Sequence, residues 1–147
     1  MDLLWQYVLV FVAAATPWLE IMIVIPVAVG LGLSPVPVTI VSFVGNALPV
    51  FGIVVLFRQW ERRRGPVRRG WSPRARRVWD RYGLPGIALA GPALTGIHLA
   101  AVMALALQAD RRRTAWWMTL SLAIWSVVTL AVTVAGFEGF RWLFGDR

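Results

Sequence analysis

Residues 36–57 read VPVTIVSFVGNALPVFGIVVLF, a run of 22 residues without a single charged side chain. A membrane-spanning helix needs about 20 such residues, because the hydrocarbon core of a bilayer is about 30 Å thick and each helical residue adds about 1.5 Å. Arg58 follows the run directly. The run therefore predicts a helix that crosses a membrane and ends at Arg58.

The rest of the chain has the same character. Uncharged runs also cover residues 3–19, 83–109 and 114–135. The 147 residues are 59% hydrophobic and only 15% charged, with a mean hydropathy of +0.68, whereas charged residues make up about a quarter of a soluble domain. The composition predicts an all-α, multi-pass integral membrane protein that forms a single membrane domain over residues 1–147.

No motif points to catalysis or to a bound cofactor. The chain has no cysteine and one histidine, His98, so no second Cys or His is present to complete a zinc site. Nucleophile–base–acid arrangements and glycine-rich phosphate loops are also absent from the sequence. We therefore expect no enzyme activity, no cofactor and no metal site.

A basic segment sets the expected orientation. Ten of the fifteen arginines lie between Arg58 and Arg81, against Glu61 and Asp80, so this segment carries the whole net charge of +8. Short arginine-rich loops stay in the cytoplasm, and in so apolar a chain a nucleic-acid patch is the weaker reading. The segment predicts a cytoplasmic loop of a plasma-membrane protein, and the absence of lysine indicates a GC-rich bacterial genome.

The end of this loop has helical spacing. Ser72 and Pro73 read as an N-cap and a first helical residue. Beyond them, apolar and basic residues fall on different faces, which is typical of a helix lying in the membrane interface. It is either a plain topology anchor or a surface for anionic lipid headgroups. The apolar set is Trp71, Ala75, Val78 and Tyr82, and the basic set is Arg74, Arg76, Arg77 and Arg81.

Arg111, Arg112 and Arg113 test the path of residues 83–109. A single crossing would put these arginines outside, against the charge rule, whereas a run that enters and returns keeps them in the cytoplasm. The run at 83–109 has 27 residues, too few for two spans, so we expect a re-entrant hairpin with a turn at residues 91–96. Such backbone needs protein or water around it.

The first half of the chain shows a similar pattern. The run at 21–33 is short, and Pro17 and Pro26 interrupt it, so we expect residues 18–33 to form a hairpin entering from outside. Pro26 to Gly30 matches Pro92 to Gly96 in Pro-x-x-x-Gly spacing. This predicts two inverted half-repeats, as in many transporters.

The expected boundaries follow from these readings. Spans are predicted at 3–16, 36–57 and 114–135, with five ordinary spans as the plain alternative. The segments are a first half-repeat with an N-terminal helix (1–57), the basic linker (58–81), a second half-repeat (82–135) and a C-terminal tail (136–147).

Five short stretches, in this order and spacing, carry a resemblance to a known family. They are Thr16-Pro17-Trp18-Leu19-Glu20, Gly30-Leu31-Gly32-Leu33-Ser34-Pro35, Val44-Gly45-Asn46, Asp80-Arg81-Tyr82-Gly83-Leu84-Pro85-Gly86 and Gly91-Pro92-Ala93-Leu94-Thr95-Gly96. At these residues the chain resembles the small multidrug export (efflux) protein family, especially its actinobacterial branch. That family is similar to the DedA membrane proteins, which implies paired re-entrant hairpins and transport of lipid-linked phosphate carriers.

Two positions depart from the wider family pattern. Many members carry an arginine two residues after the motif glutamate, where this chain has Met22. The wider pattern at the second hairpin often reads Pro-Leu-Pro-Gly-Thr-Gly, against Pro92-Ala93-Leu94-Thr95-Gly96 here. Both departures weaken a mechanism that pairs Glu20 with an adjacent arginine.

Three polar residues are candidates for chemistry at membrane depth. Glu20 is costly there, so it carries a proton or meets a cation, or else it caps a helix at the interface. His98 could titrate near neutral pH or bond a backbone group. Asn46 could bond the carbonyl freed by Pro49, hold helices together or contact substrate.

These readings predict a small membrane transporter that exports or flips an amphipathic or lipid-linked substrate where two hairpin tips meet. The alternative is a non-transporting subunit whose basic loop binds anionic lipid or a cytosolic partner. A homodimer would help to cover the hairpins' polar backbone. The predicted substrate or proton site comprises Glu20, Pro26, Gly30, Asn46, Pro92, Thr95, Gly96 and His98.

Overall fold

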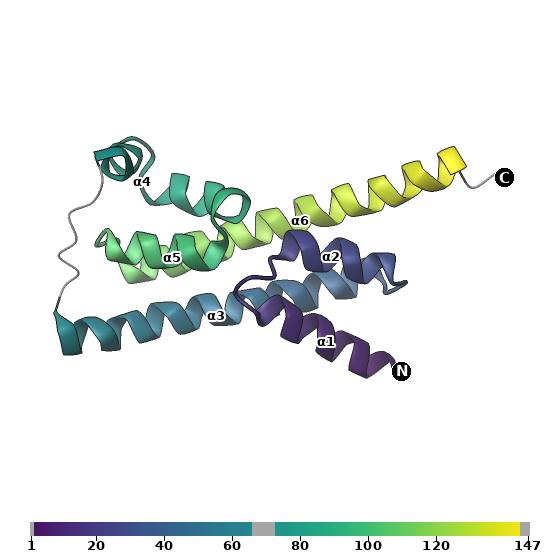
Figure 1. Cartoon of the computed structure of the whole chain (residues 1–147), viewed down its shortest axis with the longest axis horizontal. Helices are drawn as coiled ribbons and strands as arrows, with labels where there is room; N and C mark the ends of the chain where they lie inside the picture. The colour runs from purple at the N-terminus through teal and green to yellow at the C-terminus, as the bar shows by residue number, and fades with distance from the viewer. Residues whose placement is uncertain (1, 66–72, 145–147) are drawn as a thin grey trace. The chain divides into compact units, whose positions relative to one another are not determined.

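The computed structural model describes residues 2–65 and 73–144, and the regular structure in these ranges is entirely helical (Figure 1). The predicted all-α fold is therefore confirmed for the described residues. The helices are α1 (Leu3–Ala15), α2 (Ile21–Gly30), α3 (Pro35–Arg64), α4 (Pro73–Leu94), α5 (Ile97–Ala106) and α6 (Arg111–Phe144).

The chain forms two compact units. The second unit is Ala47–Leu122, and the first unit consists of the described residues on either side of it, 2–46 and 123–144. The boundaries fall inside α3 and α6, so each long helix contributes to both units. The first unit also contains α1 and α2, and the second also contains α4 and α5.

The two long helices have the length and composition of membrane spans. α3 has 30 residues and α6 has 34, which at about 1.5 Å per residue exceeds a hydrocarbon core of about 30 Å. Among the described residues they are the helices long and apolar enough to cross. The predicted spans at 36–57 and 114–135 lie within these two helices.

The remaining apolar helices are shorter. α1 has 13 residues, while α2 and α5 have 10 each, which gives lengths of about 15–20 Å, against a hydrocarbon core of about 30 Å. The helix expected at residues 3–16 is present as α1. Its crossing of the membrane, and the plain alternative of five spans, stay predictions.

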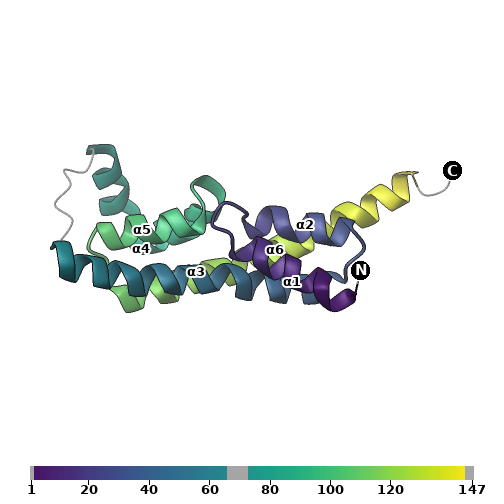
Figure 2. The same cartoon turned by 60° about the horizontal axis from the view of Figure 1, so that its bottom comes forward.

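α1 and α2 form one helical pair in the first unit. They pack against each other and are joined through residues 16–20 (Figures 1 and 2). The prediction that residues 18–33 alone fold back is wrong, because α2 continues unbroken through Pro26. A proline removes one helical hydrogen bond without reversing the chain, and the reversal takes place before Glu20.

α4 and α5 form the corresponding pair in the second unit. Helical geometry starts at Pro73 as predicted, although Trp71 and Ser72 lie outside the described residues. Gly83 interrupts α4 with φ 56° and ψ −157°, a conformation that favours glycine. After Leu94 the chain turns through Thr95 and Gly96, within the turn predicted at residues 91–96.

The short helices α2 and α5 match in length and in how they end. Each has 10 residues, and α5 starts 76 positions after α2. Leu33 N–H donates to Ala28 O at 3.2 Å, and Ala109 N–H donates to Ala104 O at 3.0 Å, 76 positions later. The residues with positive φ, Gly32 and Gln108, keep this spacing, so both ends form the same closing turn.

The burial pattern continues this correspondence into the long helices. Most buried residues of α2 and of the first part of α3 recur 76 positions later, and even the unit boundaries after Asn46 and Leu122 keep this spacing. The predicted match of Pro26–Gly30 with Pro92–Gly96 therefore has the wrong register. The matching buried pairs include Ile21 and Ile97, Ile25 and Ala101, Val38 and Thr114, Ser42 and Met118, Asn46 and Leu122, and Val50 and Ser126.

Each long helix approaches the first helix of its pair through a small residue. A Cβ added at Gly45 would lie 2.7 Å from Phe11 O of α1. In the second unit, Ser121 Oγ of α6 donates a hydrogen bond of 2.6 Å to Ala88 O of α4. Small residues of this kind let helix backbones approach closely in membranes.

The α4–α5 pair has a tight contact of its own. A Cβ added at Gly91 would lie 2.5 Å from the Cβ of Ala100, which is closer than carbon atoms pack. The contact joins one α4 glycine to one α5 methyl group, and it therefore gives a direct test of the helical pair.

We predict that Gly91→Ala lowers the free energy of unfolding by about 1–3 kcal/mol, because it overpacks this contact. Ala100→Gly in the same chain removes the opposing methyl group and recovers part of the loss. A double-mutant cycle by denaturation in detergent measures the coupling. Additive effects of the two substitutions would contradict the contact.

Candidate functional site

Glu20 stands at the entrance to α2. Its backbone is extended, with φ −72° and ψ 152°, and its carbonyl accepts hydrogen bonds from Ile23 N–H at 2.9 Å and Val24 N–H at 3.1 Å. The residue is thus the N-cap of α2, but its carboxylate makes no capping hydrogen bond. One carboxylate oxygen, Oε2, is buried. The carboxylate therefore does not cap α2.

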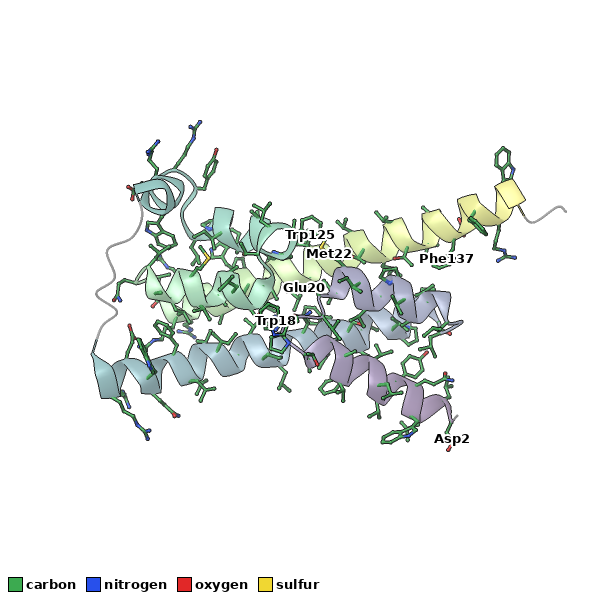
Figure 3. The ribbon with its side chains drawn as sticks, viewed as in Figure 1. Asp2, Trp18, Glu20, Met22, Trp125 and Phe137 are labelled. Atoms are coloured by element: carbon green, nitrogen blue, oxygen red, sulfur yellow. The ribbon has the colours of Figure 1, made fainter. Side chains whose placement is uncertain are left out.

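A groove of about 620 Å³ lies between α2 and the part of α6 in the first unit. Its wall is mostly apolar, and Thr129 and Thr133 add two buried hydroxyl groups. Met22 lines it two residues after Glu20, and Figure 3 shows this start of α2 with Trp125 and Phe137. The lining includes Met22, Pro26, Trp125, Thr129, Thr133 and Phe137.

The end of α2 closes against the same stretch of α6. A Cβ added at Gly30 would lie 3.2 Å from Cζ of Phe137. Pro26 and Gly30 thus lie along the helix that forms one wall of the groove, and neither is at a turn between paired helices. The structure brings the two predicted residues together, but not at the hairpin tip where the sequence placed them.

Asn46 lies on α3 and is completely buried, as is Ser42 one turn earlier. Neither the amide atoms of Asn46 nor the hydroxyl of Ser42 has a hydrogen-bond partner among the described residues. The hydrogen bond expected between Asn46 and the carbonyl freed by Pro49 is therefore not made. Sequence reasoning missed Ser42, although its i, i+4 spacing from Asn46 was visible.

The second unit gathers the other four predicted residues around one turn. Pro92 is buried in the last turn of α4, Thr95 is exposed, and Gly96 is the N-cap of α5 with φ 84°. Gly96 N–H donates to Gly91 O at 2.8 Å, which closes the turn. His98 follows on the first turn of α5 and is 5% exposed. That this turn meets Glu20 stays a prediction.

The basic face of α4 is partly described. Arg77 and Arg81 are exposed to solvent, and the guanidinium carbon of Arg81 lies 5.6 Å from the ring centroid of Tyr82. This is within the range of a cation–π interaction. Arg74 and Arg76 belong to the same helix, but their side chains lie outside the described residues. Binding of anionic lipid at this face stays a prediction.

A polar pocket of about 270 Å³ in the second unit includes an ion pair. Arg111 Nη2 donates to Glu61 Oε2 at 2.6 Å, which joins the end of α3 to the start of α6. The sequence showed both charges but gave no signal that they meet, since 50 residues separate them. Among the described residues, no group of three or more His, Cys, Asp or Glu could hold a metal ion.

Comparison with known proteins now adds to this geometry. The sequence profile of a family described as "Putative small multi-drug export protein" matches residues 20–128. The chain belongs to this family. The match starts at Glu20 and includes α2 to α5 and about half of α6.

Membership of the small multi-drug export family confirms the resemblance found in the sequence. It indicates a membrane protein that exports substrates, and it points to transport more than to catalysis. The resemblance to DedA proteins receives no such support and stays a prediction. No curated protein and no solved structure matches the chain.

We predict that the Glu61–Arg111 pair has a coupling energy of about 0.5–1 kcal/mol, because Arg111 is 36% exposed and solvent screens the charges. A double-mutant cycle with Glu61→Gln and Arg111→Gln, measured by unfolding at low and high salt, determines it. Coupling that is zero at low salt would contradict a formed ion pair.

Proposed function

We propose that this protein is an exporter that carries a small amphipathic or lipid-linked substrate through the groove of the first unit. The observation that carries the proposal is the apolar groove between α2 and α6, which has two threonine hydroxyls in its wall. Glu20 is the N-cap of α2, the helix that forms one side of this groove. Its volume of about 620 Å³ falls in the range of small-molecule sites. Membership of an export family supports the same reading.

The lining fits an amphipathic substrate. Burial of an apolar chain against Met22, Pro26 and Phe137 removes it from water, while Thr129 and Thr133 can bond polar substituents. Acidic residues in membrane segments are rare and mark ion or substrate paths. In this proposal Glu20 either receives a proton that drives export or meets a cationic group of the substrate.

The proposed topology uses α3 and α6 as the membrane spans. α1 with α2, and α4 after Gly83 with α5, then enter as re-entrant hairpins and return to the side from which they came. The Glu61–Arg111 ion pair supports this, because it joins the last turns of one long helix to the first turn of the other. Residues 83–109 would then start and finish on one side.

The charge distribution supports the same arrangement. Arg111 pairs with Glu61 of the basic segment, and Arg112 and Arg113 follow it in α6. Pro35, Val36 and Pro37 occupy the matching positions of α3. Arginines favour the cytoplasmic side. The two halves would therefore be inverted in a bacterial plasma membrane, with one hairpin entering from each side.

Such a repeat is compatible with alternating access, in which the substrate path opens to one side of the membrane at a time. The hairpins need protein around their polar backbone, so we propose that two copies associate as a homodimer.

Four arginines of α4 would hold anionic headgroups at the cytoplasmic surface. They are Arg74, Arg76, Arg77 and Arg81.

A transport assay tests the function. We predict that proteoliposomes export at least one of three probes: a fluorescent hydrophobic cation, an amphipathic anion or a lipid-linked phosphate. Thr133→Trp fills the groove and should reduce flux at least about tenfold, whereas Val127→Trp, on an exposed face of α6, should not. Glu20→Gln should remove the dependence of flux on a pH gradient.

Two results would contradict the proposal. If Thr133→Trp and Val127→Trp reduce the flux equally, the groove is not the path of the substrate. If purified protein moves none of the probes, and neutralising the loop arginines abolishes a complex with a cytosolic partner, the protein is a non-transporting membrane subunit.

A further inference from the structure

We propose that Ser42 and Asn46 form a binding subsite for a neutral group that both donates and accepts hydrogen bonds, such as a carboxamide or hydroxyl of the substrate. This inference deepens the proposed export function by naming a substrate feature, and it rests on that function only for what the ligand is. The two residues lie one turn apart on α3, in the first unit.

Their burial is the first argument. Both side chains are 0% exposed, and Ser42 Oγ, Asn46 Oδ1 and Asn46 Nδ2 have no hydrogen-bond partner among the described residues. A polar group taken from water without a new partner destabilises the fold. Proteins rarely keep such groups unpaired, so each one calls for an explanation, often a functional one.

The matching positions of the second unit show that the fold does not need polar groups here. Met118 and Leu122 lie on α6, 76 positions after Ser42 and Asn46, and are also 0% exposed. An apolar pair therefore fills the same place in the same arrangement of helices. The polar pair of α3 costs stability that the apolar pair of α6 does not.

Other buried hydroxyls in the second unit are used differently. Thr114 Oγ1 donates to Asp110 O at 2.9 Å, and Ser121 Oγ donates to Ala88 O at 2.6 Å. Each bonds a backbone carbonyl, the first within the start of α6 and the second between α6 and α4. Ser42 and Asn46 make no such side-chain hydrogen bond among the described residues, so they differ from polar residues that join helices.

A third acceptor lies in the same turn of α3. Pro49 has no N–H group, so it cannot donate to the carbonyl of Gly45, which a regular helix would pair with residue 49. Ser42, Gly45 and Asn46 thus offer oxygen acceptors within about one helical turn, and Asn46 adds an N–H₂ donor.

This mixture of donors and acceptors selects the ligand. A cation would satisfy the oxygen atoms but would leave the Asn46 N–H₂ group buried without an acceptor, and an anion would face unpaired oxygens. A neutral carboxamide or hydroxyl satisfies both kinds of group at once. Because the pair is fully buried, a ligand reaches it only when the surrounding helices move apart.

The test measures binding without transport. Purified protein in nanodiscs receives decanamide, methyl decanoate or decyltrimethylammonium at equal mole fraction in lipid, and its thermal unfolding is followed. The three probes share an apolar chain. Decanamide adds a hydrogen-bond donor and acceptor, methyl decanoate adds an acceptor alone, and decyltrimethylammonium adds a cation. Decanamide should raise the Tm of the wild type more than the other two do.

Ser42→Ala/Asn46→Leu copies the apolar character of the second unit without adding much volume. Without ligand it should unfold at the same temperature as the wild type or higher, and its affinity for decanamide should fall at least about tenfold, since one lost hydrogen bond is enough for that. Leu122→Asn is the reciprocal variant, and it should lower the Tm and create no response to decanamide.

Three results would overturn the subsite. If decanamide shifts the Tm of the wild type and of the double variant equally, the pair holds a water molecule only. A double variant that unfolds at a lower temperature without ligand means that the pair is structural. A larger shift with decyltrimethylammonium means that the ligand is a cation. A failed export assay alongside selective decanamide binding would contradict the proposed function alone.

Discussion

The fold depends on the rule that backbone polar groups in a membrane must be paired within the protein, since hydrocarbon offers no hydrogen bonds. α3 and α6 meet the rule as long helices. α1, α2 and α5 have only 10–13 residues, so their ends would fall inside the hydrocarbon if they stood alone. The closing turns after α2 and α5 pair the last carbonyls, and packing in helical pairs shields the rest.

The same constraint explains the likeness of the two halves. A short helix followed by the same closing turn and then by a long helix occurs twice, 76 residues apart. The halves differ where charge and polarity matter. Arg111 opens α6 where Pro35 opens α3, and Met118 and Leu122 replace Ser42 and Asn46. Packing explains the shared positions, and our proposals assign the differing ones to orientation and ligand binding.

Hydropathy and charge predicted much of this structure. The spans at 36–57 and 114–135, the helix start at Pro73 and the turn at Thr95 and Gly96 all follow from local signals that the fold obeys. The helix expected at 3–16 is present as α1, and its crossing of the membrane stays a prediction. The hairpin at 18–33 was wrong because apolar composition does not show where a helix stops. Pro26 looked like a break, but α2 continues through it.

The candidate site was less predictable. Glu20 and Asn46 stood out as polar residues among apolar ones, and both lie in the first unit. The partner of Arg111, the wall formed by Thr129 and Thr133, and the burial of Ser42 depend on which helices meet. Tertiary packing fixes these relations, and no local pattern in the sequence encodes them.

The central claim is that the two halves enter the membrane from opposite sides. The chain has no native cysteine, so Ser34→Cys and Arg112→Cys, both at exposed positions before or at the start of a long helix, report sidedness cleanly. A membrane-impermeant thiol reagent on intact cells should label position 34 and should reach position 112 only after the membrane is opened. Labelling of position 112 from outside would contradict the account.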